Sequence, residues 1–401
     1  MSLWTIVLRS LRQHALSTVI TAFSIALAGG LLMAVWVVKT EAQRNFSQVN
    51  AGFDAVLGPR SSKLQLVLNS IFHVEASPGL LSPKDVEDIR KHPAVQHAIP
   101  IAVGDNYYGY RIVGTLTNML ADVEYSPGKR YRFESGRVFD PMLREAVVGS
   151  FVAQKLGLKV GSTFQPFHGL NFDPKSQHQE TYVVVGVLDP SNTPTDRVIW
   201  IPLTGVQLMG GHDAALSSQV SAVLIKLRGG AQTGFRLDTM YNKQGDRLTF
   251  AWPIDTVMTQ LFDKIGWFDK ILALVAYLVA LVAAGSILAS IYNTMNERRR
   301  EFAILRALGA RRGTVFSAIV LEAASITFLG ALAGYLVYGG ILAAAFVIVR
   351  DRTGVVLDAF RPDPAMWLVP LAMIALGALA GLVPAFKAYR TDVASNLTPL
   401  S

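Results

Sequence analysis

The chain has 401 residues, of which 51% are hydrophobic and 16% charged, with a formal net charge of +8 and no cysteine. Soluble globular proteins carry about 25% charged residues, so this composition argues against a soluble chain and predicts membrane-spanning segments. Without cysteine there can be no disulfide and no thiolate metal site. In a membrane protein the positive charge belongs in cytoplasmic loops and beside anionic lipid, and we expect no nucleic-acid partner.

Four apolar stretches are each long enough to cross a ~30 Å hydrocarbon core as a helix, which takes about 20 residues. They predict transmembrane helices at residues 15–38, 271–292, 315–340 and 366–386. The first stretch is too long for the apolar region of a signal peptide, and no A-x-A-like cleavage site follows it, so we expect it to remain as an anchor. Pro370 and Pro384 in the fourth stretch are tolerated where neighbouring helices satisfy the freed carbonyl groups.

The third stretch stays apolar to about Val349 and is too long for one straight span. We expect Gly339-Gly340 to divide it, so that the span ends there and a short helix continues along the outer surface within an outer loop of residues 341–365. Small residues that permit close helix packing, and with it pairing of two copies of such a chain, include Ala283, Ala284, Gly285, Gly330, Ala333 and Gly334.

Basic residues in the short segments predict the orientation in the membrane. Arginine and lysine gather at residues 1–14, 293–314 and 387–401, whereas three arginines of the outer loop are offset by three aspartates. Both termini and the loop at 293–314 are therefore predicted to be cytoplasmic. Residues 39–270 then lie outside, because long segments cross the membrane regardless of their charge.

Residues 39–270 have the character of a soluble domain. We expect the flanking segments Glu41–Leu57 and Ile254–Asp269 to extend the neighbouring transmembrane helices. Apolar runs bounded by Gly, Pro, Asn and Asp predict strands at Ala146–Val148, Tyr182–Leu188, Val198–Ile201 and Val220–Leu227. The fold class is thus an α-helical membrane protein with four transmembrane helices and an α+β periplasmic domain inserted between helices 1 and 2.

Two helices within this domain are predicted from their capping residues. Ser82 followed by proline opens a helix that continues to about Lys91, and Gly157 ends a second helix that begins at Ser150. The apolar run Leu64–Leu68 either packs on the domain core or contacts lipid or an apolar substrate, and the sequence does not decide between them.

The histidines of the domain show no metal-binding or catalytic spacing. They stand at His73, His92, His97, His168, His178 and His212. His92 and His97 are five residues apart, which does not place them on one helix face as a spacing of four would. Neither H-E-x-x-H nor G-x-S-x-G occurs. We therefore expect no catalytic, cofactor or metal site, and an ordinary exposed side chain at each histidine.

The most informative local pattern is Asn296–Gly313, NERRREFAILRALGARRG. It predicts a helix with an apolar stripe beside an arginine face, ended by Gly309. The stripe consists of Phe302, Leu305 and Leu308. Such a helix either lies on lipid headgroups or docks on a cytoplasmic partner, and physical chemistry alone favours neither.

Part of this pattern, Arg300–Ala310, resembles the signature of the FtsX-like permeases, the family that includes MacB and LolC. Arg144–Thr163, Val185–Arg197 and Pro384–Asp392 also resemble segments of that family, so the resemblance covers nearly the whole chain in order. In the family the signature is a coupling helix that sits in a groove of an ATPase subunit. The resemblance implies ATPase-coupling roles for Glu297, Arg300, Glu301, Leu305, Arg306, Leu308 and Gly309.

The resemblance implies a non-catalytic permease subunit of an ABC transporter in the bacterial inner membrane. No G-x-x-x-x-G-K-[ST] phosphate loop occurs, so ATP and magnesium are expected on a separate ABC ATPase subunit, with no cofactor bound directly to this chain. The other expected partners are membrane lipids and a second permease, either identical or a paralogue. The sequence leaves open a periplasmic adaptor or substrate-carrying protein.

Two functions follow from this resemblance. The first is a transporter that extrudes or extracts an amphipathic or apolar substrate. The alternative is a transmembrane signal transmitter that activates an envelope partner such as a peptidoglycan hydrolase. The large outer segment favours transport, because FtsX itself has a smaller one.

Overall fold

The computed structural model describes residues 3–48, 50–211, 214–297, 304, 306–307, 309–353 and 362–390. The chain divides into two compact units. One, the membrane unit, comprises residues 1–41, 265–347 and 358–401. The other, the inserted domain, comprises residues 42–264 and 348–357.

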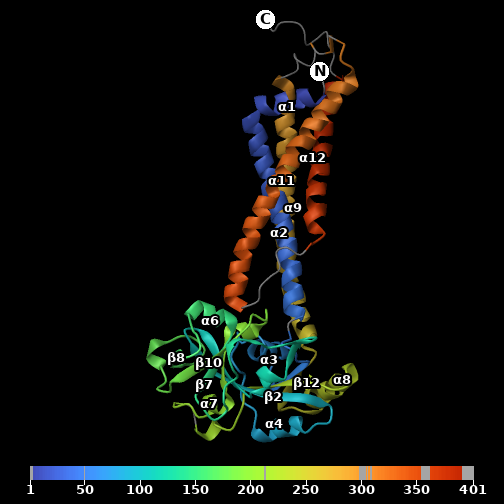
Figure 1. Ribbon diagram of the computed structural model, residues 1–401. Coiled ribbons are helices and arrows are strands. Elements are labelled where there is room, and N and C mark those ends of the chain that lie inside the picture. The colour runs from blue at the N-terminus through green and yellow to red at the C-terminus, as the bar shows by residue number, and fades with distance from the viewer. Residues whose placement is uncertain are drawn as a thin grey trace. The chain divides into compact units, whose positions relative to one another are not determined.

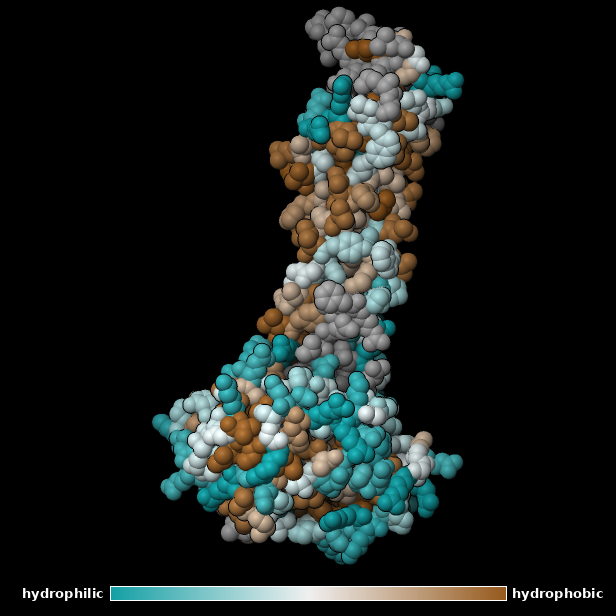
Figure 2. All heavy atoms as spheres, in the orientation of Figure 1, coloured by the Kyte–Doolittle hydropathy of each residue, from teal (hydrophilic) through white to brown (hydrophobic). Residues whose placement is uncertain are grey.

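The membrane unit is built from helices with apolar surfaces. Their bounds are α1 (Leu3–Gln13), α2 (Ala15–Gln48), α9 (Ile254–Glu297), α11 (Arg312–Thr353) and α12 (Ala365–Arg390) (Figure 1). The last four contain candidate spans with mean hydropathy of 2.1 to 2.6, at Ala15–Glu41, Lys270–Ala289, Arg312–Asp351 and Ala365–Lys387. Large apolar side chains such as Leu336 and Leu371 are 80% and 70% exposed, and Figure 2 shows hydrophobic residues over the surface of these helices. Lipid rather than water is the solvent that suits such a surface.

α1 is a separate short helix, whereas the sequence had indicated only a cytoplasmic N-terminal segment there. Val7 and Ser10 are buried on one side of it, while Trp4 is 61% exposed and Arg9 and Arg12 are also exposed. A short helix that presents tryptophan and arginine together suits the membrane–water interface.

α11 corrects the expected break at Gly339-Gly340. The helix is 42 residues long and runs through both glycines to Thr353, so residues 341–353 are helical rather than loop. Glycine in a helix interior costs only about 1 kcal/mol relative to alanine, and the apolar residues on both sides sustain the helical hydrogen bonds. Asp363 then caps α12, since its Oδ1 accepts a 2.8 Å hydrogen bond from the Ala365 N–H.

The small residues of the membrane helices serve packing within the chain. A Cβ on Gly330 would lie 2.7 Å from the Ile25 Cβ and 2.8 Å from the Ala22 carbonyl oxygen, so α11 and α2 meet there backbone to backbone. Gly334 similarly faces Ala26 of α2, and Ala283 is only 1% exposed. Of the three glycines expected to serve permease pairing, Gly285 is the one with open space around its Cα.

The inserted domain is a mixed sheet covered by short helices. Its strands are β1 (Ala55–Pro59), β2 (Val95–Tyr107), β3 (Tyr110–Thr115), β4 (Glu124–Ser126), β5 (Lys129–Arg130), β6 (Phe133–Gly136), β7 (Glu145–Val148), β8 (Thr163–Phe164), β9 (Phe167–His168), β10 (Tyr182–Leu188), β11 (Val198–Pro202), β12 (Ala222–Leu227) and β13 (Leu248–Ala251). The helices are α3 (Lys63–Ser70), α4 (Pro83–Arg90), α5 (Asn118–Ala121), α6 (Ser150–Leu156), α7 (Leu203–Gln207) and α8 (Ala231–Thr239).

The strand order in the main sheet is β13-β1-β12-β2-β3-β11-β7-β10-β6, with β9 paired to β2 and β8 to β10. β11 pairs with β3, and β10 with β7, in parallel, and the remaining pairs are antiparallel. The long strand β2 joins the two halves of the sheet. Its register shifts between Val103 and Asp105, which makes Gly104 a β-bulge that re-aims the side chains that follow.

Several predicted elements are confirmed. The strands β7, β10, β11 and β12 lie at the expected positions, and α6 ends at Gly157 with φ of 67°. Ser82 forms a capping box with Asp85 at the start of α4. The run Leu64–Leu68 lies in α3, where Leu66 and Val67 are fully buried, so it packs on the domain core.

The expected helical extension Glu41–Leu57 is only partly present. α2 ends at Gln48, and Ala55–Leu57 lie in β1, which is fully buried from Ala55 to Leu57. The extended conformation is favoured there because β1 pairs with β12 on one edge and β13 on the other. The extension at Ile254–Asp269 is confirmed, since α9 begins at Ile254.

Candidate functional site

The predicted coupling segment lies between α9 and α11. Of its seven predicted ATPase contacts, Arg300, Glu301, Leu305 and Leu308 lie outside the described residues. Glu297 is the last residue of α9, and Arg306 is helical and half-buried. Gly309 has φ of 101°, and its N–H donates a 3.0 Å hydrogen bond to the Arg306 carbonyl, so a turn follows the helical residues 306–307. Contact with an ATPase stays a prediction for all seven.

Aromatic and cationic side chains hold together the helix ends that flank this segment. The Lys387 ammonium of α12 hydrogen-bonds the Tyr292 hydroxyl of α9 and lies 4.3 Å from the centroid of that ring. The Arg312 guanidinium of α11 lies 5.9 Å from the Tyr389 ring, and Phe316 packs edge-on against Phe386. Cation–π contacts of this kind stabilise exposed sites by about 0.5–1 kcal/mol each. These contacts link the end of α9 and the start of α11 to α12.

Glu322 is a buried carboxylate within the apolar part of α11. It is 8% exposed, and its Oε1 accepts a hydrogen bond from the Ser10 hydroxyl of α1. Placing an ionisable group inside a membrane-spanning helix costs free energy, and such a group commonly has a functional role. No site was predicted at Glu322 from the sequence, although it is the only charged residue between Arg312 and Arg350.

Two of the family-like segments of the inserted domain touch each other. Gly149, in Arg144–Thr163, lies so close to Val185–Arg197 that a Cβ would be 2.4 Å from the Asp196 carbonyl oxygen. The Asp196 carboxylate accepts hydrogen bonds from the Ser191 and Asn192 N–H groups at 2.9–3.0 Å. Burial raises the pKa of the Asp196 carboxylate, and the hydrogen bonds from Ser191 and Asn192 partly offset this rise. The two segments therefore form one packed corner of the domain.

His73 and His178 depart from the expectation of exposed side chains, whereas the side chain of His168 is 56% exposed and His212 lies outside the described residues. His73 is 7% exposed with φ of 54°, and its ring packs edge-on against Trp200 at 5.6 Å. Burial, with a smaller effect of the Arg111 charge, lowers the pKa of His73 to about 3, so the ring is neutral. His178 is 8% exposed. The burial of His73 and His178 could not be predicted from the sequence, because burial of a single histidine depends on contacts between distant segments.

Two protein families match this chain, one over its N-terminal part and one over its C-terminal part. Residues 15–234 match the MacB-like periplasmic core domain, and residues 273–393 match the FtsX-like permease C-terminal region. Solved structures with similarity include the extracellular domain of the noncanonical ABC-type transporter YknZ, from Gram-positive bacteria (TM-score 0.30, 16% identity, 49% of this chain and 97% of that one). They also include the periplasmic region of MacB from Actinobacillus actinomycetemcomitans (TM-score 0.33, 11% identity, 52% and 94%).

Curated relatives carry a longer chain. The pyoverdine export ATP-binding/permease protein PvdT of Pseudomonas fluorescens is 26% identical over 63% of this chain and 37% of its own length. The macrolide export ATP-binding/permease protein MacB of Neisseria meningitidis is 22% identical over 80% of this chain and 48% of its own. This chain thus spans less than half the length of these relatives. With its two family matches, the chain belongs to the ABC transporter permeases that combine a MacB-like periplasmic core domain with an FtsX-like C-terminal region.

Proposed function

We propose that the chain is the permease subunit of an ABC transporter driven by a separate ATPase subunit, and that it extrudes or extracts an amphipathic or apolar substrate. In this proposal both termini and the loop at 293–314 are cytoplasmic, and the membrane is the bacterial inner membrane. ATP and magnesium bind to the ATPase. Two permeases and two ATPases form the working complex.

The observation that carries the proposal is the length and anchoring of α9. Its 44 residues span about 66 Å, roughly twice the ~30 Å hydrocarbon core. Ile254, Val257 and Met258 at its start are buried in the core of the inserted domain. Ala280, Ala283 and Ile287 are buried in the core of the membrane unit. One unbroken helix anchored in both cores supports coupling, because a displacement need not be absorbed by a loop.

The same helix ends at Glu297, where the predicted ATPase-coupling segment begins. The apolar stripe of that segment must be buried against a protein or against lipid. Docking into an ATPase groove buries Leu305 and places Glu301 against the partner, whereas a lipid-bound helix would depend on its arginines.

Co-purification of the ATPase with the tagged full chain separates these two modes. We expect Leu305→Ala to weaken docking by about 1–3 kcal/mol and Glu301→Lys to weaken it further by like-charge contact or an unpaired buried group. The control is a variant in which Arg298, Arg299 and Arg300 are neutralised together. If the segment lies on lipid, this variant weakens the contact of the segment with the lipid headgroups. Normal recovery of ATPase with both the Leu305 and Glu301 variants would show that the segment does not dock on it.

The substrate side of the proposal has its own readout. ATP hydrolysis by the reconstituted complex in nanodiscs should rise when an amphipathic substrate is added. A complex that responds instead to an envelope protein such as a peptidoglycan hydrolase would be the signal transmitter, and the transport proposal would be wrong.

A further inference from the structure

Three side chains of metal-ligand type converge at one edge of the inserted domain. They are Asp105 of β2, which is fully buried, His178, which is 8% exposed, and His168 of β9, whose side chain is 56% exposed. Asp105 Oδ1 lies 3.2 Å from His178 Nε2 and 3.4 Å from His168 Nδ1. The three donor atoms all lie within 4.8 Å of one another.

The backbone holds this arrangement from several sides. Asp105 follows the bulge at Gly104 and stands directly opposite His168 in the antiparallel β2–β9 pair, so their side chains share a face. The Asn106 Nδ2 group donates to the carbonyls of residues 167, 169 and 171 at 2.9–3.3 Å and pins the turn after β9. The His178 N–H donates a 2.8 Å hydrogen bond to the Pro166 carbonyl.

The tautomer of His178 points a lone pair at Asp105. His178 Nδ1 lies 2.8 Å from the Gly210 carbonyl oxygen, which can only accept, so Nδ1 carries the proton and donates. In the neutral ring Nε2 is then an acceptor, and it faces the acceptor oxygen of Asp105 at 3.2 Å. Two acceptors at that distance repel unless a proton or a metal cation lies between them. A ring that donates its other N–H to a backbone carbonyl is also the usual second-shell arrangement of a metal-bound histidine.

The distances suit a tetrahedral ion. Metal–ligand bonds of about 2.0–2.1 Å to histidine nitrogen and carboxylate oxygen place neighbouring ligand atoms about 3.3–3.4 Å apart. The two distances from Asp105 Oδ1 lie at 3.2 and 3.4 Å. Two imidazoles and one carboxylate are a donor set suited to zinc. We propose that Asp105, His168 and His178 bind one divalent transition-metal ion of the zinc class, independently of any ATPase coupling.

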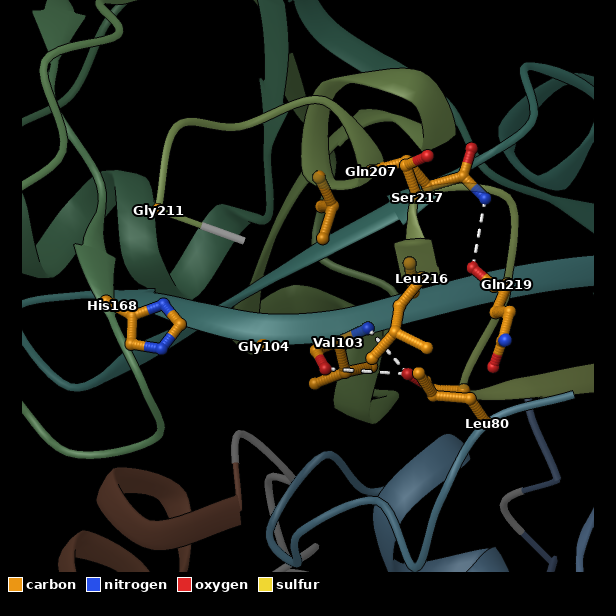
Figure 3. Close-up of a pocket in the computed structure, with 12 residues that line it drawn as sticks. Leu80, Val103, Gly104, His168, Gln207, Gly211, Leu216, Ser217 and Gln219 are labelled. Carbon is orange, nitrogen blue, oxygen red and sulfur yellow. Dashed lines mark hydrogen bonds between the residues drawn. The ribbon is translucent and has the colours of Figure 1, made fainter. Parts of the chain in front are cut away.

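A pocket adjoins one of the three proposed ligands, His168. A pocket of about 320 Å³ is lined by His168 together with Gly104, Val103, Leu216 and Ser221 (Figure 3). Figure 3 places the His168 ring at one end of it, beside Gly104. Of the three proposed ligands, His168 is the one that lines this pocket and can be reached from it.

Metal binding by the purified full chain in detergent tests the proposal. The protein is prepared without a polyhistidine tag, stripped with a chelator and dialysed against Zn²⁺, and the metal per chain is measured by mass spectrometry. We expect one tightly bound Zn²⁺ per chain, a tetrahedral spectrum with Co²⁺, and a higher unfolding temperature with Zn²⁺. Competition with a chromogenic chelator should show that Asp105→Asn and His178→Gln each weaken binding about tenfold or more.

Two further variants keep the result decisive. His97→Gln, on the same strand and outside the cluster, should bind Zn²⁺ as the unaltered chain does. His168→Ala removes an exposed ligand, so this variant should fold normally and still bind Zn²⁺ more weakly. It therefore tests the site even if the variants at the buried ligands fail to fold. Absence of bound metal would overturn the proposal and leave a protonated His178 paired with Asp105. Equal binding by the unaltered chain and His168→Ala would place the metal elsewhere and would also overturn it.

Discussion

The membrane unit and the inserted domain place large and small side chains in opposite ways. In the inserted domain the largest residues are innermost, and Trp200 and Tyr182 are 0% and 1% exposed. In the membrane unit the described buried positions of α9 are Ala276, Ala280, Ala283 and Ile287, three of them alanine, while leucines face outward. Water drives bulky apolar groups inside, whereas lipid rewards close contact between helix backbones and accepts the bulky groups outside.

Removing one tryptophan from each unit gives the largest expected contrast. Trp200→Ala should destabilise the inserted domain by about 3–5 kcal/mol, because it empties a fully buried site. Trp36 of α2 is 56% exposed, so Trp36→Ala should change stability by only about 0.5 kcal/mol. Hydrogen exchange of β11 amides reports the first, and thermal unfolding in detergent reports the second. Equal losses would contradict the comparison.

A methyl group added to two glycines tests close packing in the membrane unit. Gly330→Ala should cost about 1–3 kcal/mol, because its Cβ would meet the Ala22 carbonyl and Ile25 within 2.8 Å. Gly285→Ala should be neutral or stabilising, since nothing lies within 4 Å of its Cβ position. Thermal unfolding of the two variants in the same detergent is the measurement. A harmless Gly330→Ala would mean that α2 and α11 do not pack through backbone contact.

The buried histidine predicts a pH dependence confined to the inserted domain. The pKa of His73 is about 3 in the folded domain and about 6.5 when unfolded, so between those values the unfolded chain binds a proton that the folded one does not. This contribution to stability is complete above pH 6.5 and declines as the pH falls, by about 1.4 kcal/mol per unit.

His73→Phe should flatten that decline while the membrane unit keeps its own pH profile. The slope is the readout, because Phe inherits the positive φ of His73 and any strain from it is the same at every pH. Hydrogen exchange of β11 amides between about pH 7 and pH 5 measures it. His97→Gln serves as the control, and a slope unchanged by His73→Phe would show that other groups set the pH dependence.

Hydropathy predicted the spans because the signal is carried by composition alone. Capping residues predicted helix ends nearly as well, because Ser82 and Gly157 each interact only with the helical turn beside them. The prediction of a helix at Ala55–Leu57 and the prediction of a break at Gly339-Gly340 were wrong for a common reason. Local sequence favours helix in the first and a break in the second, and tertiary pairing or continuous apolar packing overrides it.

The candidate sites also divide into those that a local sequence pattern predicts and those that only contacts between distant segments create. The coupling segment could be predicted because its residues are contiguous. Asp105 and His178 could not, because a shifted strand register and a hydrogen bond from His178 to the Gly210 carbonyl bring them together. The sequence did contain Glu322, a lone acid in a long apolar run, but its partner Ser10 lies on a helix far away in the chain.

The two connections of the inserted domain lie next to each other. β1 enters the sheet and β13 leaves it as paired neighbours, with Val56 opposite Ala251. The Ile254 N–H at the start of α9 reaches the Asp54 carbonyl. A domain whose entry and exit are adjacent can be gained, lost or exchanged as a cassette without changing the helices that carry it. The same pair of helices can therefore carry inserted domains of different size in the course of evolution.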